Sequence, residues 1–225
     1  MLVLFVLTFL VTAFFVENRR GIVGEDAFAS LTDGSSSQAT VGNVNTSVRS
    51  AIPQLETADD PYLGPAEANV VVVEFIDYQC PFSRQAFSPV RELALEYKDR
   101  VKFIVRDFPL NDIHPQAQPA AEAAGCAEAQ GLEKFWAYHD KLYLNQAALS
   151  ENLYPTLAGQ VGLDRVAFAA CLASGERKAE ITTDYLDGAT AGVRGTPTYF
   201  INGRMVQGVI PKDKFAKVLD LLLKK

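Results

Sequence analysis

Cys80 is the residue of this sequence with the clearest capacity for covalent chemistry. It stands in VVVVEFIDYQCPFSRQAFSP (residues 70–89), between a run typical of a buried strand and a segment with helical periodicity. A cysteine just before a helix meets the unpaired N–H groups of the first turn and the positive end of the helix dipole, and both favour thiolate. Free cysteine has a pKa of about 8.5, whereas cysteines in such places have pKa values of about 3.5 to 7.5. We therefore expect a nucleophilic thiol at an exposed turn; the alternative is a small buried core residue.

A carboxyl group, Glu74, lies in the middle of the strand-like run. A buried carboxyl group has a raised pKa and suits proton transfer. Its position six residues before Cys80 places it on the strand just behind the cysteine. The alternative is a strand near a sheet edge, from which Glu74 would reach water.

The motif GTPT, residues 195–198, is a third chemical signal. A proline entering a strand is poorly tolerated unless its bond is cis, a form that costs only about 0.5 to 1 kcal/mol at X–Pro bonds. A cis Thr196–Pro197 bond would expose the backbone of Thr196 for pairing with an extended substrate segment. An ordinary trans proline at the start of a strand is the alternative.

The position three residues after Cys80 holds Ser83, not a second cysteine. A second thiol normally resolves the mixed disulfide and stores the oxidised state, so these two residues alone cannot perform dithiol chemistry. A single thiolate can still attack a disulfide, and a substrate thiol or a small thiol can then resolve the product. Ser83 could donate a hydrogen bond to the thiolate.

Composition limits the other classes of function. The chain has 225 residues, of which 48% are hydrophobic, enough for one good core. Its formal net charge is −6, and without a block of Lys and Arg this argues against a nucleic-acid partner. The two histidines and three cysteines have no zinc-like spacing, and nothing suggests a metal or an organic cofactor.

The chain opens with an apolar segment, MLVLFVLTFLVTAFFV. As a helix it would be about 24 Å long, slightly short of a bilayer core of roughly 30 Å. We expect an export signal or signal anchor within residues 1–18, with an uncleaved anchor over residues 1–16 favoured over a cleaved signal and over a buried helix. Arg19 and Arg20 follow the segment, which opposes this topology by the positive-inside rule. The polar composition of residues 19–58 predicts a flexible linker.

The folded domain is expected over residues 59–225. Residues 70–76 and the segment RVKFIVRDFPL are interpreted as parallel strands joined by a helix in a right-handed βαβ unit. Residues from about 115 to 188 have helical patterns, Asn202–Gly203 predicts a hairpin, and an amphipathic helix follows. Without the helical block the order is βαβ-ββα. The sequence therefore predicts an α/β thioredoxin fold with an inserted helical subdomain.

Three further residues receive structural interpretations. His114 begins the insertion, where a capping or packing role is favoured over a place near the active site. His139 fits the packing face of a helix better than a cofactor role. Pro119 is awkward inside a helix, so that a helix should start there.

Four stretches together resemble the DsbA-like thioredoxin-fold proteins of bacteria, which include membrane-tethered extracytoplasmic thiol-disulfide oxidoreductases. The resemblance covers residues 60–225 and rests on PYLGPAEANVVVVEFIDYQCPFSRQAFSP, HPQAQPAAEAAGCAEAQGLEKFWAYHDKLYLNQ, AFAACLASG and GVRGTPTYFING. It implies a nucleophile at Cys80, an acid behind it at Glu74, and a cis Thr196–Pro197 bond facing the site. The departure is Ser83, because the family motif is Cys-x-x-Cys.

The resemblance also bears on the other two cysteines. Cys126 and Cys171 match a pair often present in the family, which implies a structural disulfide. If bridged across 45 residues, they would stabilise the fold by roughly 4 kcal/mol on the chain-entropy model. A shuttle of either cysteine with Cys80 is the alternative.

Two classes of function follow for such a chain. The favoured one is a monothiol reductase or isomerase outside the cytoplasm, anchored to the membrane, with Cys80 acting on cysteine-containing exported proteins or on low-molecular-weight thiols such as glutathione in mixed disulfides. The alternative is a non-catalytic, membrane-tethered binding or chaperone-like module that has lost its resolving cysteine. Peroxide sensing through a sulfenic acid at Cys80 is a third hypothesis.

Overall fold

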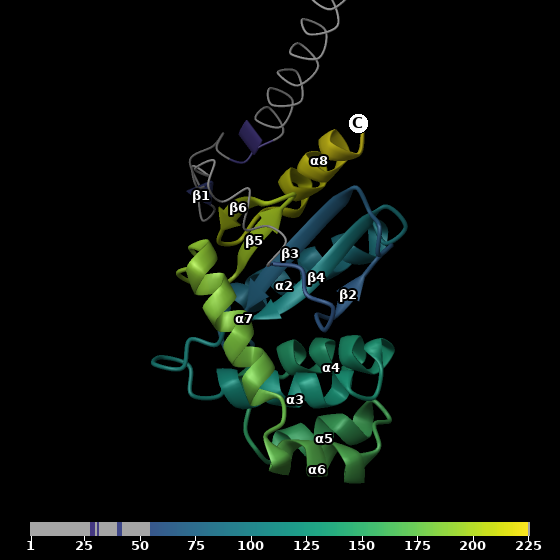
Figure 1. Cartoon of the computed structure of the whole chain (residues 1–225), viewed down its shortest axis with the longest axis vertical. Coiled ribbons are helices and arrows are strands. Elements are labelled where there is room, and N and C mark those ends of the chain that lie inside the picture. Colours follow the sequence, from purple (N-terminus) through teal and green to yellow (C-terminus); the bar gives the residue numbers. More distant parts are fainter. Residues whose placement is uncertain (1–27, 30, 32–39, 42–54, 225) are drawn as a thin grey trace, which may run out of the picture.

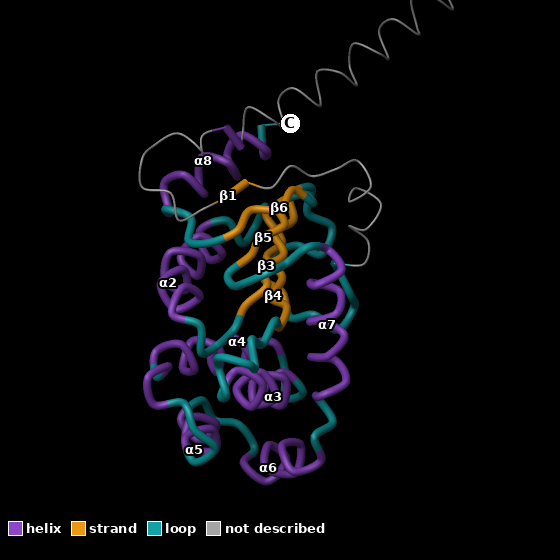
Figure 2. The backbone as a smooth tube through the Cα atoms, turned by 90° about the vertical axis from the view of Figure 1, so that its left-hand side faces the viewer, coloured by secondary structure: helices purple, strands orange, loops and turns teal. Residues whose placement is uncertain are grey.

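The computed structural model describes residues 28–29, 31, 40–41 and 55–224 as a sheet flanked by helices (Figure 1). In chain order the elements are β1 Thr40–Val41, β2 Tyr62–Leu63, β3 Val70–Ile76, α2 Pro81–Glu96, β4 Val101–Asp107, α3 Ala117–Glu128, α4 Leu132–Leu144, η3 Gln146–Ala148, α5 Leu153–Gln160, α6 Arg165–Ser174, α7 Lys178–Ala191, β5 Thr198–Ile201, β6 Arg204–Gln207 and α8 Lys212–Leu223. The strand order is β1-β6-β5-β3-β4-β2. Figure 2 shows the sheet edge-on between α2 and α7, with α3–α6 gathered beyond one end. The predicted α/β thioredoxin fold with a helical insertion is confirmed.

Strand β3 is the centre of the fold because its β-branched and aromatic residues can be covered on both faces. It pairs in parallel with β4 and antiparallel with β5. Val70 and Val72 pack into the cluster formed with α2 and α8. Val73 and Phe75 pack on the opposite face, where α7 lies. The β3–α2–β4 unit therefore brings the chain to the start of α2 at the carboxyl end of a rigid strand.

The hairpin between β5 and β6 forms where Asn202–Gly203 predicts it. Both residues have positive φ, 45° and 77°, as a two-residue turn between twisted strands requires. The Asn202 side chain accepts a hydrogen bond from the Val71 N–H at 2.7 Å and donates one to the Asn69 carbonyl at 3.1 Å. These bonds fix the turn against the start of β3.

The helical insertion differs from its prediction at both ends. Helix α3 begins at Ala117, two residues before the predicted start at Pro119. A proline in the first helical turn is tolerated because the N–H that it lacks would have no acceptor within the helix. Helix α7 continues past residue 188 to Ala191, and Gly192 ends it with a φ of 99°.

A buried ion cluster holds α7 to the sheet. Arg106 of β4 is 1% exposed. Its guanidinium lies 2.8 Å from Asp184, 2.9 Å from Asp187 and 3.2 Å from Asp60. A buried guanidinium is tolerated only with such partners. Burial raises the pKa of Asp184 to about 7, although Arg106 acts to lower it.

Parts of the predicted linker pack against the domain. Phe28 and Leu31 are buried in the cluster that also contains α8, and the Arg204 guanidinium lies 4.7 Å from the centre of the Phe28 ring. Strand β1 pairs with the otherwise open edge of β6. The predicted signal or anchor, residues 1–18, lies outside the described residues. Within the described residues, no helix has the length and apolar character needed to cross a bilayer.

Candidate active site

Cys80 is the N-cap residue of α2, with extended φ and ψ of −67° and 124°. Pro81 follows as the first helical residue, a place that proline favours. The Cys80 Sγ donates a hydrogen bond to the Thr196 carbonyl at 3.3 Å. Only 3% of Cys80 is exposed, so the expectation of an exposed turn is wrong. The reason is tertiary: a loop 116 residues further along the chain lies against the thiol.

That loop contains the Thr196–Pro197 bond, which is cis in the structure. Two bonds hold the loop on the hairpin: the Thr198 hydroxyl donates to the Gly195 carbonyl at 2.7 Å, and the Gly208 N–H donates to the Pro197 carbonyl at 2.9 Å. The Thr196 hydroxyl is buried and has no partner among the described residues. The cis-proline loop thus presents Thr196 to the start of α2, as the family resemblance implies.

Glu74 lies on β3 opposite Tyr199 of β5, in the middle of the sheet. The alternative of an edge strand therefore does not apply. Burial raises the pKa of Glu74 to about 7, while the neighbouring Tyr199 hydroxyl acts to lower it. A carboxyl group with this pKa can gain and lose a proton near neutral pH.

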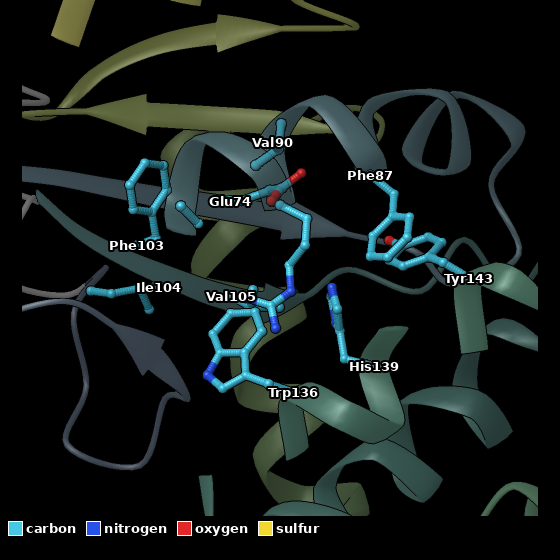
Figure 3. A pocket seen from close by; sticks show the side chains of 11 residues that line it. Glu74, Phe87, Val90, Phe103, Ile104, Val105, Trp136, His139 and Tyr143 are labelled. Atoms are coloured by element: carbon cyan, nitrogen blue, oxygen red, sulfur yellow. The ribbon is translucent and has the colours of Figure 1, made fainter. Parts of the chain in front are cut away.

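A small cavity borders Glu74 between α2, the sheet and α4. Figure 3 shows Glu74 among Phe87, Trp136, His139 and Tyr143. The space open to the centre of a water molecule is about 20 Å³, which is room for about one water. Burial lowers the pKa of His139 to about 3, so its imidazole is neutral at physiological pH. His139 accepts or donates a 2.9 Å hydrogen bond with the Tyr78 hydroxyl in this aromatic cluster, as a packing role predicts.

Ser83 is 1% exposed and points into the protein. Its hydroxyl has no hydrogen-bond partner among the described residues. Ser83 therefore does not donate the hydrogen bond to Cys80 that the sequence suggested. The Tyr143 hydroxyl lies nearby: burial raises the pKa of Tyr143 well above its ordinary value, and Ser83 acts to lower it. The geometry of this pair falls outside the usual limits for a hydrogen bond. Ser83 therefore fills the position of a second thiol without taking over its chemistry.

Asp77 is the site residue that the sequence reasoning missed. Its carboxylate is 2% exposed and accepts hydrogen bonds from Gln79 N–H at 2.7 Å and Cys80 N–H at 3.0 Å. The other oxygen accepts from Leu110 N–H at 2.9 Å and pairs with His114 Nδ1 at 2.7 Å. His114 thus lies near the site after all. An aspartate that ends a strand often caps the following turn in this way, which was the available signal.

A groove of about 450 Å³ lies beside the cysteine. Phe82, which is 52% exposed, forms one wall. The cis-proline loop and the end of the hairpin form the rest, with Arg194, Gly195, Thr196, Pro197, Gln207, Gly208 and Val209. The groove has the size of a small-molecule or short-peptide site.

One cluster of carboxylates has the composition of a metal-ligand set. Asp107, Glu180 and Asp184 bring oxygen atoms within 4.8 Å of one another. Burial raises the pKa of Glu180 to about 8 and that of Asp107 well above its ordinary value. Asp184 binds Arg106 in the buried contact between α7 and the sheet. Repulsion between the neighbouring carboxylates adds to the effect of burial in raising the pKa values of Asp107 and Glu180.

Comparisons with known proteins agree with this geometry. The family model described as Thioredoxin matches residues 56–221. The thiol-disulfide exchange protein alpha-DsbA2 from Wolbachia pipientis superposes with a TM-score of 0.72 at 22% identity, over 80% of this chain and 100% of that one. A periplasmic thioredoxin-like protein from Salmonella enterica serovar Typhimurium gives 0.64 at 21% identity, over 82% and 100%.

A curated relative carries a similar domain within a longer protein. The Na(+)/H(+) antiporter NhaA 3 of Salinispora tropica is 41% identical over 149 residues, which are 66% of this chain. The chain spans 22% of the antiporter's length. The solved relatives share the fold of this chain. Since the family model covers most of the sequence, this chain belongs to the thioredoxin family.

Proposed function

We propose that this protein is a thiol-disulfide oxidoreductase that acts through the single thiol of Cys80, on disulfides of other proteins or on mixed disulfides with low-molecular-weight thiols. The observation that carries the proposal is the hydrogen bond between the Cys80 Sγ and the Thr196 carbonyl, at the edge of an open groove. A chain that pairs with the cis-proline loop comes close to this thiol, and it reaches the sulfur once the loop shifts, because only 3% of Cys80 is exposed.

The first chemical step is a thiolate attack. The Cys80 thiolate attacks one sulfur of a substrate disulfide, a bond between Cys80 and that sulfur forms, and the substrate S–S bond breaks. The leaving thiolate takes up a proton. We assign Glu74, with its pKa of about 7, to the exchange of the proton that the Cys80 thiol loses.

The second step needs a thiol from outside the site. A substrate cysteine or a small thiol attacks the mixed disulfide and releases Cys80. If the attacking thiol belongs to the same substrate, a disulfide is rearranged with no net oxidation; if two outside thiols end as a disulfide, the substrate is reduced. Ser83 cannot take part because thiol–disulfide exchange needs a thiolate nucleophile, and a serine hydroxyl cannot form or break an S–S bond.

The burial of Cys80 favours a second candidate. Only 3% of Cys80 is exposed. A partner therefore has to displace the cis-proline loop, or bind alongside it as it moves, to reach the sulfur. A binding module that holds extended chains in the groove, with Cys80 unused, is compatible with this geometry.

We further propose that the domain works outside the cytoplasm, held at the membrane by residues 1–16. The apolar run supports this, and so does the bond between Cys126 and Cys171, because oxidising compartments maintain disulfides. Protease treatment of spheroplasts, in which the outer layers are opened and the cytoplasmic membrane is intact, followed by carbonate extraction of the membranes, tests both parts. Protection from the protease would contradict the proposed side of the membrane.

The decisive experiment measures the Cys80 thiolate on the full chain. Its ultraviolet absorbance is followed against pH, with Cys80→Ala as the blank and the Cys126–Cys171 disulfide intact. We expect a pKa well below the free value of about 8.5, and turnover of a glutathionylated peptide that Cys80→Ala abolishes. A pKa at or above the free value, without turnover, would replace the enzyme by the binding module.

A further inference from the structure

One charged residue lies in the groove beside Cys80, and it is a cation. Arg194 lines the groove together with apolar, glycine, hydroxyl and amide residues, and none of the described residues in that lining carries a carboxylate. A cation in such surroundings favours ligands that bring a negative charge.

Arg194 is held in place by the backbone beneath it. Its Nη1 donates hydrogen bonds to the Val193 carbonyl at 2.9 Å and to the Ala189 carbonyl at 3.1 Å. These bonds fix one edge of the guanidinium on the end of α7. Because arginine has five N–H donors, the Nε and Nη2 groups remain to bind a ligand.

No acid of the described chain neutralises this guanidinium. Arg91 and Arg106, in contrast, have aspartate partners at 2.8 Å. No described carboxylate lies within ion-pair distance of Arg194. The charge is therefore free to meet a carboxylate from outside.

A second polar group of the groove also has no partner. The Thr196 hydroxyl is buried, Thr196 is 7% exposed, and no described residue bonds to that hydroxyl. Arg194 lies two residues before Thr196, whose carbonyl already contacts the Cys80 thiol. An extended chain that places its cysteine at Cys80 would pass both groups, since extended residues advance about 3.3 Å each.

On the basis of the proposed function, we propose that the substrate is an extended polypeptide segment with an acidic side chain within about two residues of its disulfide cysteine, and that Arg194 binds that carboxylate. Phe82, half exposed in the same groove, receives a neighbouring apolar side chain. Arg194 is here a specificity-determining residue. The chemistry is the exchange already described: the Cys80–substrate S–S bond forms as the substrate disulfide breaks, and the leaving peptide thiolate takes up a proton.

The test uses three symmetric peptide disulfides that differ only in the residues flanking cysteine, which are Glu, Gln or Lys. The full chain, with Cys80 reduced, reacts with each, and acid-quenched samples are analysed by mass spectrometry for the Cys80–peptide adduct. Each rate constant is divided by that of 2-mercaptoethanol with the same peptide, because flanking charges alter the disulfide itself. We expect the Glu peptide to react about twofold to fivefold faster than the Gln peptide, and the Lys peptide more slowly, with the differences shrinking in high salt.

Two variants separate recognition from general charge. Arg194→Glu should reverse the order of the Glu and Lys peptides. Arg165→Glu, at the start of α6 in the helical insertion, changes net charge equally and should leave the order unchanged. The proposal is overturned if Arg194→Glu leaves the order of the peptide rates unchanged, or if Arg165→Glu reverses it. It is also overturned if glutathione disulfide reacts faster than the Glu peptide and its rate depends on Arg194 in the same way. Wild type that forms no adduct with any disulfide overturns the proposed function itself, whereas equal rates for the three peptides overturn only the substrate class.

Discussion

Glu74 gives the site a measurable dependence on pH. Its pKa is about 7 in the folded protein and about 4.3 in an unfolded chain. The folded state therefore binds the proton more tightly, and the free energy of unfolding must fall as pH rises from about 4.3 to 7. Glu74→Gln cannot ionise, so we expect it to be more stable than wild type at pH 8, by about 4 kcal/mol at most.

Urea unfolding at pH 4.5 and pH 8 checks this expectation. The advantage of Glu74→Gln should be largest at pH 8 and nearly absent at pH 4.5. Glu67→Gln, at an exposed position before β3, is the matched control and should follow the wild-type curve. A Glu74→Gln curve parallel to wild type would show that the carboxyl group ionises freely in the fold.

Ser83→Cys should restore a dithiol site. The side chain is buried within the first turn of α2, and Cys is close to Ser in size. Under oxidised glutathione, we expect wild type to keep a mixed disulfide at Cys80 and Ser83→Cys to form an internal disulfide with the release of glutathione. Intact mass distinguishes the two states, because the variant should lose the glutathione adduct and two hydrogens. A persistent adduct on the variant would mean that the second sulfur cannot reach Cys80.

The residues of the site differ in how far sequence could predict them. Glu74 and Cys80 lie six residues apart on one strand–turn–helix unit, so local pattern sufficed for both. The Asp77–His114 pair spans 37 residues, and the cover over Cys80 comes from 116 residues away. Such contacts depend on how the sheet brings loops together at the carboxyl ends of its strands. No local period of hydrophobicity reports them.

Among the elements, α7 is fitted to the sheet most closely at Gly188. A Cβ there would lie 2.8 Å from Phe75 and 2.9 Å from Phe108. Overpacking by Gly188→Ala should therefore lower the free energy of unfolding by about 1 to 3 kcal/mol. The higher helix propensity of alanine offsets roughly 1 kcal/mol of that loss.

Gly159→Ala in α5 is the matched control for this substitution. Its Cβ would meet only Arg165, at 3.7 Å. We expect it to raise the free energy of unfolding by up to about 1 kcal/mol. Urea denaturation of both variants separates the two effects, and a Gly188→Ala protein as stable as Gly159→Ala would contradict the tight contact.

The elements themselves followed from sequence where a pattern was long or a turn was specific. Strand β3 has the predicted bounds, and the hairpin turns at Asn202–Gly203. The two-residue strands β1 and β2 were not predicted, because each is defined by the strand that it pairs with and not by its own composition. Pro119 misled the prediction of the α3 start because a proline is compatible with any position in a first turn.

At the scale of the whole molecule, the disulfide between Cys126 and Cys171 joins α3 to α6. Its partners are 45 residues apart in the sequence. Replacing both cysteines with alanine should cost about 4 kcal/mol on the chain-entropy model. We expect a lower urea midpoint for the double variant, matching that of wild type treated with a reductant. Equal midpoints for the variant and untreated wild type would show that the helical insertion is held by packing alone.

The same disulfide has a consequence for the maturation of the protein. Closing it removes two electrons from the chain, and some acceptor has to take them. The turn that holds Cys80 and Ser83 has a single sulfur. It therefore cannot accept these two electrons by reduction of a disulfide of its own. The chain must therefore be matured by a separate oxidant. A protein proposed to act on the disulfides of other proteins thus depends on another protein or oxidant to form its own disulfide.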